Sequence, residues 1–142
     1  MTAKQYLSRA YGLRRRIAAK LSHLEELRTQ AEHITPTITG LPKGNLPGSP
    51  VERAAADIAD LTWEIDLDYL DLLVYQEEIR KTIEAVEDPA ANQVLSYRYL
   101  SYKTWSEIED LMHYSRRQLY RIHAKGLRIV DDVIECHHTP VI

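Results

Sequence analysis

Apolar residues recur at three- and four-residue spacing near the N-terminus, which predicts one amphipathic helix over residues 3–33. Arginine and glutamate side chains lie between these apolar positions, which are Leu7, Ala10, Ile17, Leu21, Leu24 and Ala31. Residues 34–50 then hold four prolines and three glycines, a density that predicts a long exposed loop. A helix-start signal ends this loop, with Ser49 as N-cap, Pro50 at the first helical position and Glu52 three residues after the serine.

No proline or glycine interrupts residues 51–87, which are predicted to form a long helix with a coiled-coil-like seam. The seam residues fall every seven positions: Ile58, Ile65, Leu72, Ile79 and Val86. An acidic ridge lies on another face of this helix and comprises Asp57, Asp60, Glu64, Asp68, Asp71 and Glu78. A basic first helix and an acidic second helix are expected to pair as an antiparallel hairpin, and the same seams also suit pairing between two chains in a homodimer.

Asp88 and Pro89 close the long helix and start a new unit. A helix is predicted over residues 90–101, and Thr104 and Glu107 then form a capping box that begins a short helix. After a tight turn, Ser115 and Gln118 form a second capping box that begins the last helix. The expected fold is therefore all-α: a helical hairpin or coiled-coil arm over residues 1–88, a helix-turn-helix over residues 89–135 and a tail over residues 136–142.

The last predicted helix, residues 115–133, has an apolar face and an opposite basic face. Arginine binds guanine edges and glutamine binds adenine edges, while further basic residues neutralise phosphates. A small residue, Ala124, lies within the basic strip and would allow close approach to a groove. The helix N-terminus at Thr104 adds exposed N–H groups that favour phosphate. The residues expected to bind double-stranded DNA are Lys103, Thr104, Ser115, Arg116, Arg117, Gln118, Tyr120, Arg121, Lys125 and Arg128.

The formal net charge of −3 does not exclude DNA binding, because such binding depends on local patches of basic residues. Residues 1–48 carry a charge of +5 and residues 49–92 a charge of −9. Residues 93–128, which include the predicted helix-turn-helix, carry +4. The basic charge is therefore concentrated where DNA contact is expected.

The segment RYLSYKTWSEIEDLMHYSRRQLYRIHAKGLRIV resembles region 4 of sigma-70-type factors. It is also similar to phage and prophage transcription regulators of the ArpU/RinA kind and to a related phage family of unknown function. The matching positions are Arg98, Tyr99, Thr104, Glu107, Ile108, Leu111, Ser115, Leu119, Ile122 and Leu127. The resemblance implies that Ser115 to Arg121 read bases, that Lys103 and Thr104 contact phosphates, and that host RNA polymerase is a partner.

Two residues depart from that motif, which has a small residue at the position of Glu109 and glycine at the position of His113. Glycine suits the turn because the backbone there takes a positive φ, and histidine tolerates this conformation better than most residues. Glu109 has to point outward, or the crossing of the two helices has to open. These departures bear on the helix crossing more than on the presence of the motif.

Other classes of function have less support in the sequence. No run of 18 apolar residues is present, the start resembles no secretory signal, and Cys136 is the single cysteine, so we expect a protein of the bacterial host cytoplasm without a membrane span. The group Glu135, Cys136, His137 and His138 lacks the spacing of a zinc site, and no nucleophile arrangement or Gly-rich loop is present. We therefore expect that the protein is not an enzyme and that it binds no metal, cofactor or small-molecule substrate.

Two alternatives to a transcription regulator remain open. A small terminase-like component of phage DNA packaging also joins a helix-turn-helix to an oligomerising helical part. A protein-interaction module would use the basic strip against an acidic protein. The acidic ridge is in addition a candidate surface for RNA polymerase.

Overall fold

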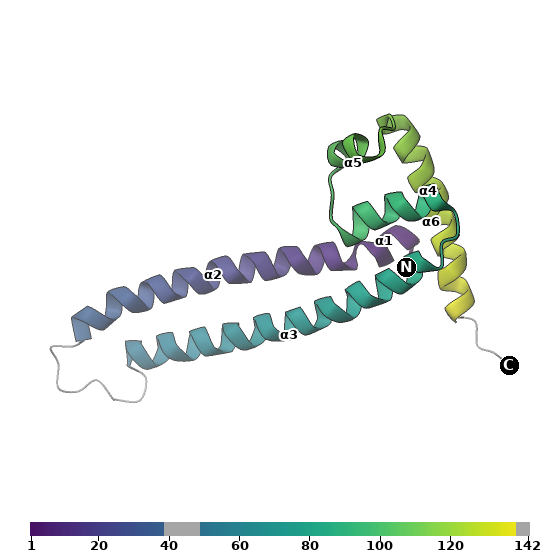
Figure 1. The fold of residues 1–142 in the computed structure, drawn as a ribbon. Helices are drawn as coiled ribbons and strands as arrows, with labels where there is room; N and C mark the ends of the chain where they lie inside the picture. The colour runs from purple at the N-terminus through teal and green to yellow at the C-terminus, as the bar shows by residue number, and fades with distance from the viewer. Residues whose placement is uncertain (39–48, 139–142) are drawn as a thin grey trace. The chain divides into compact units, whose positions relative to one another are not determined.

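The computed structural model describes residues 1–38 and 49–138, except for the side chains of residues 35–38 and 137–138. Within these residues every regular element is helical, as the sequence predicts (Figure 1). The helices are α1 (Ala3–Leu7), α2 (Arg9–Ile38), α3 (Pro50–Glu84), α4 (Pro89–Leu95), the π-helix η1 (Ser96–Leu100), α5 (Trp105–Met112) and α6 (Arg116–His138).

The first predicted helix begins at Ala3 as expected, but it is divided near Ser8 and continues past its expected end at residue 33. The chain leaves the helix at Ser8, and α1 is anchored to a distant element because the amide of Ala3 donates to Asp131 Oδ1 at 2.8 Å. Helix α2 continues to Ile38, so residues 34–38 of the predicted loop are helical. Pro36 lies within that last stretch, where a proline removes one backbone donor but keeps a helical φ. Residues 39–48 of the predicted loop lie outside the described residues.

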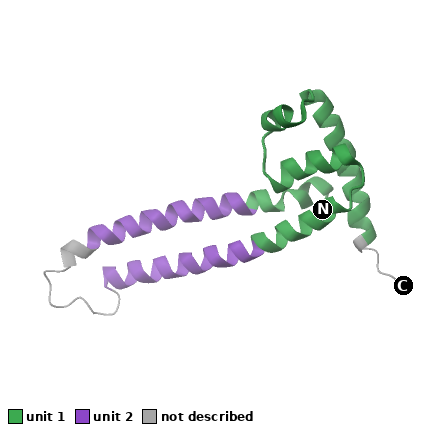
Figure 2. Ribbon diagram, in the orientation of Figure 1, with its two compact units in different colours: residues 1–12, 72–142 green, residues 13–71 purple. Residues whose placement is uncertain are grey.

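The described residues form two compact units, one made of residues 13–71 and the other of residues 1–12 together with residues 72–138 (Figure 2). The division between them does not fall at residue 88, where a domain boundary was expected. The N-terminal residues contact both neighbouring parts of their unit: Tyr6 Oη lies 3.2 Å from Thr82 Oγ1 at the end of α3, and the amide of Ala3 donates to Asp131 of α6.

The unit of residues 13–71 is an antiparallel hairpin of α2 and α3 within one chain. This is one of the two pairings that the sequence suggested, the other being a pairing between two chains. Leu13, Ile17 and Leu24 of α2 are buried together with Leu61 and Ile65 of α3. At its start, α3 has the predicted cap, because the amide of Glu52 donates to Ser49 Oγ at 3.2 Å.

One residue of the acidic ridge lies inside this hairpin. Asp68 is 6% exposed, and its two carboxylate oxygens accept from Arg16 Nη2 at 3.0 Å and Lys20 Nζ at 2.8 Å. Lys20 Nζ also lies 3.5 Å from Glu64 Oε2. The hydrogen bond from Lys20, supported by Arg16, holds the pKa of Asp68 below its ordinary value. The ridge is therefore partly a pairing surface for α2, while Asp57, Asp60 and Asp71 are exposed.

Replacing Asp68 with asparagine is expected to lower the free energy of unfolding by about 1–3 kcal/mol, because it removes the buried carboxylate that Arg16 and Lys20 share. Since folding lowers the pKa of Asp68, its contribution is present above its ordinary pKa and is lost as the pH falls through the folded value. Urea unfolding at pH 7 and at pH 3 measures both effects. The matched control is the exposed Asp57→Asn, and equal stability of the two variants would contradict the assignment.

In the other unit, the apolar faces of α4, α5 and α6 form a core with α1 and the end of α3. The fully buried large side chains of this unit are Leu7, Ile79, Ile83, Val94, Leu95, Ile108, Leu119 and Val130. Gly126 allows close approach of α6 to α4, since a Cβ there would lie 3.1 Å from Leu95 Cδ1.

The helix predicted over residues 90–101 is two elements. Asp88 caps α4 as predicted, accepting from the amide of Ala91 at 3.0 Å. The chain then widens into η1, where the amide of Ser101 donates to the carbonyl of Ser96 at 3.0 Å, and Tyr102 follows with a φ of 57°. The hydroxyl of Tyr102 accepts from Gln76 Nε2 at 2.8 Å, a contact between residues that are distant in the sequence.

Candidate nucleic-acid interface

A short helix, a tight turn and a longer helix lie where the two capping boxes predict them. Thr104 Oγ1 accepts from the amide of Glu107 at 3.2 Å and begins α5. Helix α5 ends at His113, which has φ 57° and ψ 35° and donates its amide to the carbonyl of Glu109. Histidine therefore takes the left-handed conformation expected at this position. Ser115 is the N-cap of α6. Both hydrogen bonds of its capping box are present, because the amide of Gln118 donates to Ser115 Oγ at 3.2 Å and the amide of Ser115 donates to Gln118 Oε1 at 3.0 Å.

A small apolar core holds α5 against α6. Ile108 and Leu119 are fully buried beside Val94, and Trp105, Met112 and Ile122 pack on them half-buried. The predicted apolar face of α6 is thus confirmed, since Leu119, Gly126 and Val130 are all buried.

Glu109 accommodates the helix crossing by pairing with the first residue of α6. Its Oε1 accepts from Arg116 Nε at 2.5 Å, and Arg116 Nη2 donates to Ser106 Oγ at 3.0 Å. The Tyr120 hydroxyl and the Glu109 carboxylate raise the pKa of Arg116. Arg116, expected to read bases, therefore fastens α6 to α5.

Several other residues predicted to bind DNA also have partners within the protein. Lys125 Nζ donates to Asp88 Oδ2 at 2.6 Å, which joins α6 to the N-cap of α4 and lowers the pKa of Asp88. Lys103 Nζ lies 3.8 Å from Glu107 Oε2. The ring of Tyr120 meets that of Trp105 edge-on, with 5.1 Å between centroids. Ser115, Gln118 and Thr104 serve as caps, as described above.

Three arginines of α6 differ from these residues. Arg117, Arg121 and Arg128 are exposed, and within residues 1–38 and 49–138 they take part in no hydrogen bond or ion pair. At 100° per residue they lie within about 40° of one another, and the exposed Ala124 lies on the same line. We call these three residues the arginine row. The row is about 16 Å long from Arg117 to Arg128 at 1.5 Å per residue.

Behind the start of α6, a cluster that the sequence analysis missed joins α6 to η1 and α5. His123 Nε2 and Tyr99 Oη lie 2.7 Å apart, and the His123 ring meets Trp105 edge-on at 4.9 Å. Burial, with smaller contributions from Lys4 and Arg98, lowers the pKa of His123 to about 4, and burial raises the pKa of Tyr99 to about 12. The i, i+24 spacing of two aromatic polar residues gives no local signal of this contact.

The free energy of unfolding is expected to fall by up to about 3 kcal/mol as the pH drops from 6.5 to 4, because His123 has its ordinary pKa of 6.5 when unfolded and about 4 when folded. Between these values the unfolded chain binds the additional proton, so stability rises with pH and levels off above 6.5. Urea titrations of His123→Gln should show a shallower slope over this range. His23→Gln, at an exposed site, should keep the wild-type slope, and a slope unchanged in both variants would contradict the assignment.

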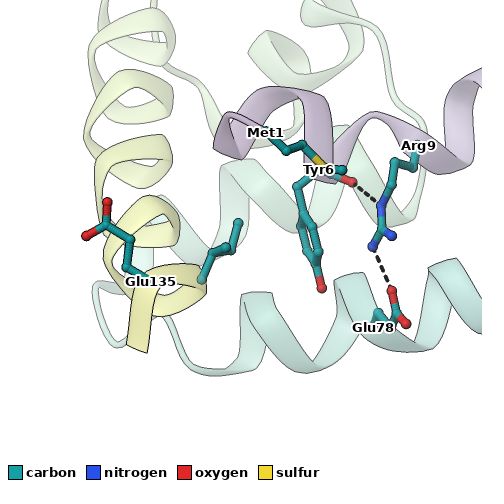
Figure 3. Close-up of a pocket in the computed structure, with 6 residues that line it drawn as sticks. Met1, Tyr6, Arg9, Glu78 and Glu135 are labelled. Atoms are coloured by element: carbon teal, nitrogen blue, oxygen red, sulfur yellow. Dashed lines mark hydrogen bonds and ion pairs between the residues drawn. The ribbon is translucent and has the colours of Figure 1, made fainter. Parts of the chain in front are cut away.

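A cavity of about 630 Å³ lies elsewhere in the same unit, between α1, α2, the end of α3 and the end of α6 (Figure 3). Its cation, Arg9, is already bound: Nη2 donates to Glu78 Oε2 at 2.7 Å and Nε to the carbonyl of Tyr6 at 3.1 Å. The guanidinium also lies 4.2 Å from the ring centroid of Tyr6. The arginine that lines the cavity is therefore engaged within the protein.

The predicted C-terminal tail begins too early, because α6 continues through Cys136 to His138. Cys136 is exposed, and the side chains of His137 and His138 lie outside those described. Among the described side chains no three His, Cys, Asp or Glu residues gather as a metal site.

No protein-family model matches this chain, and no curated protein or solved structure was found to be similar to it. None of the described helices is long and apolar enough to span a membrane.

Proposed function

We propose that this protein is a sequence-specific, double-stranded DNA-binding transcription regulator that reads the major groove with α6. The observation that carries the proposal is the arginine row on α6, presented by a helix that is fixed behind it by a buried core. In this proposal, α5, the left-handed turn at His113 and α6 form a helix-turn-helix. Such motifs place the N-terminal residues of the second helix at base edges.

The arginine row divides into base-reading and backbone-binding positions. Arg117 and Arg121 lie in the first two turns of α6, where a recognition helix meets base edges, and arginine binds guanine O6 and N7 with two hydrogen bonds. Arg128 lies two turns further on and suits a phosphate. Ala124 lies between Arg121 and Arg128, and its small side chain allows the helix to approach the groove closely.

The residues with internal partners hold the reading helix in place. Arg116 joins α6 to α5, Lys125 joins it to the cap of α4, and Gln118 closes the capping box with Ser115. The side chain of Lys103 is 42% exposed at the start of α5, so Lys103 and the N-terminus at Thr104 suit phosphate contacts beside the groove. This assignment narrows the ten expected contact residues to three principal ones.

The phage or prophage origin and a contact with host RNA polymerase rest on the resemblance of the C-terminal segment to sigma region 4 and to phage regulators. The exposed acids of the ridge, Asp57, Asp60 and Asp71, support a polymerase contact only through their charge. A terminase-like packaging role shares the helix-turn-helix but requires a large ring, which the mass in solution distinguishes. An interaction module without DNA binding is distinguished by the DNA experiment itself.

The test is a footprint of the purified chain on DNA fragments from its own genome neighbourhood, across a salt series. The proposal predicts a protected site that persists near physiological salt. Uniform binding that collapses with rising salt would leave only phosphate attraction and contradict a specific reader. Absence of binding at every salt concentration would favour a protein partner.

A further inference from the structure

An exposed apolar strip runs along α3, on the side opposite its buried face. The side chains of Trp63, Leu67, Leu70 and Val74 are 65%, 45%, 60% and 55% exposed. At 100° per residue these four lie about 180° from the buried Leu61 and Ile65, which pack in the hairpin. We call the four residues the outer strip.

The outer strip is unlike the rest of the hairpin surface. The corresponding outward side of α2 carries Arg15, Ala19, Ser22 and Glu26, all exposed. Single exposed apolar residues are ordinary, but a contiguous apolar patch that includes a tryptophan marks an interaction site. The four side chains, with the neighbouring Leu73 at 62% exposure, expose an area on the order of 500 Å². Each partner in a stable complex contributes roughly 800 Å², so the apolar strip accounts for more than half of that area before any polar rim is added.

We propose that the outer strip is the interface with a second copy of this chain, whose α3 packs against it in antiparallel orientation. Successive strip residues are separated by four, three and four positions, which is the a and d spacing of a helix that pairs with another helix. This spacing reads the same in both directions. An antiparallel partner therefore sets Leu67 against Leu70 and Trp63 against Val74, and a two-fold axis repeats both contacts.

The charges beside the outer strip favour the antiparallel over the parallel arrangement. In the antiparallel pair, Glu64 of each copy lies near Asp71 of the other, and Glu64 already has Lys20 at 3.5 Å within its own chain. On the strip's other edge, Asp66 lies near Leu73, so the two symmetry-related Glu64–Asp71 contacts are the like-charged ones in this arrangement, and each has a lysine beside its glutamate. In a parallel pair Asp66 would instead face Asp71, with no cation beside either residue among the contacts of the described residues.

Sedimentation equilibrium of the full chain over a concentration series tests the interface, with no DNA present. We expect a mass of twice the 16.4 kDa of one chain at high concentration and a dissociation constant raised about 100-fold or more by Leu67→Glu with Leu70→Glu. The matched control is Leu21→Glu with Leu111→Glu, two exposed leucines outside the strip, which should leave the dimer intact. Far-UV circular dichroism checks that both double variants keep the wild-type helix content.

A monomeric wild type up to about 100 μM would overturn the proposal, because interfaces of this size bind more tightly than that. A dimer that survives Leu67→Glu with Leu70→Glu would also overturn it, since the contact would then lie elsewhere. A discrete mass of eight or more copies would overturn the two-fold pairing and favour a ring. Each of these results is independent of whether the chain binds DNA.

Cross-linking tests the orientation in a Cys136→Ser background, which removes the exposed native thiol. Leu67→Cys and Leu70→Cys chains are oxidised separately and as an equimolar mixture. Antiparallel pairing predicts the fastest disulfide formation in the mixture, because residue 67 of one copy then faces residue 70 of the other. Faster cross-linking of either chain with itself would contradict the antiparallel arrangement.

Discussion

Arg117→Ala combined with Arg121→Ala is expected to weaken binding to the specific DNA site by about 100-fold or more, while the fold is unchanged. Each arginine that binds a guanine with two hydrogen bonds contributes about 1–3 kcal/mol of discrimination, and both side chains are exposed without partners among the described residues. The affinity for unrelated duplex should fall much less, so the ratio of specific to non-specific binding should decrease. Fluorescence anisotropy with a labelled specific duplex and a scrambled duplex measures both quantities.

The control for this prediction removes the same charge elsewhere. Arg15 and Arg28 are exposed on α2, and replacing both with alanine lowers the net charge by two without touching α6. We expect that variant to keep the wild-type preference for the specific site. If both double variants lose affinity equally, binding depends on overall charge, and the assignment of the arginine row is wrong.

Leu119→Ala is expected to lower the free energy of unfolding by about 2–5 kcal/mol in the unit that contains α5 and α6, since it leaves a cavity in the core between these two helices. Leu119 is fully buried and packs with Ile108 and Val94, so the surrounding side chains can relax only partly. Because this core fixes the reading helix, the affinity for the specific site should fall as well. Urea unfolding followed by tyrosine and tryptophan fluorescence measures the loss of stability.

Leu111→Ala is the matched control for Leu119→Ala, because Leu111 lies on α5 and is 48% exposed. The same chemical change there should cost less than about 1 kcal/mol. A similar loss of stability in the two variants would show that the described core does not hold α5 and α6 together. The comparison thus separates packing from helix propensity.

The elements that could be predicted from the sequence are those that depend on neighbouring residues. Ser49, Thr104 and Ser115 begin helices because each side chain reaches an amide three residues later, which is a local event. The long seam of α3 predicts its burial for the same reason, since a seven-residue repeat keeps one face of a helix toward its partner. The tight turn follows from the short sequence separation of two helices whose starts are both marked, whereas its left-handed conformation at His113 was implied by the resemblance to a motif with glycine at that position.

What the sequence did not reveal depends on residues far apart in the chain. Asp131 anchors the amide of Ala3 across 128 positions, and Asp68 becomes buried only because α2 brings Arg16 and Lys20 beside it. The wide turn of η1 contains the buried Tyr99, and no periodicity in the sequence indicates this turn. The candidate site shows the same limit. The basic strip was predicted, but the partners of Arg116 and Lys125 became apparent only in the folded chain.

The proposed DNA-binding surface depends on both local and long-range interactions. Local signals place a basic helix after a tight turn, and long-range contacts then decide which of its cations are engaged. The three arginines of the row remain available on one face, while the others brace the helix. In the proposed function, Arg117 and Arg121 of this row meet base edges in the major groove.

The most direct test of that claim pairs one arginine with one base. In the footprinted site, each guanine is replaced in turn by 7-deazaguanine, which lacks the N7 acceptor in the major groove, and the affinities of wild type and Arg117→Ala are compared. We expect a discrete guanine whose replacement weakens wild-type binding by about 1 kcal/mol or more but has no further effect on Arg117→Ala. Losses that are equal in both proteins at every guanine, or no loss at any guanine, would contradict base reading by this helix.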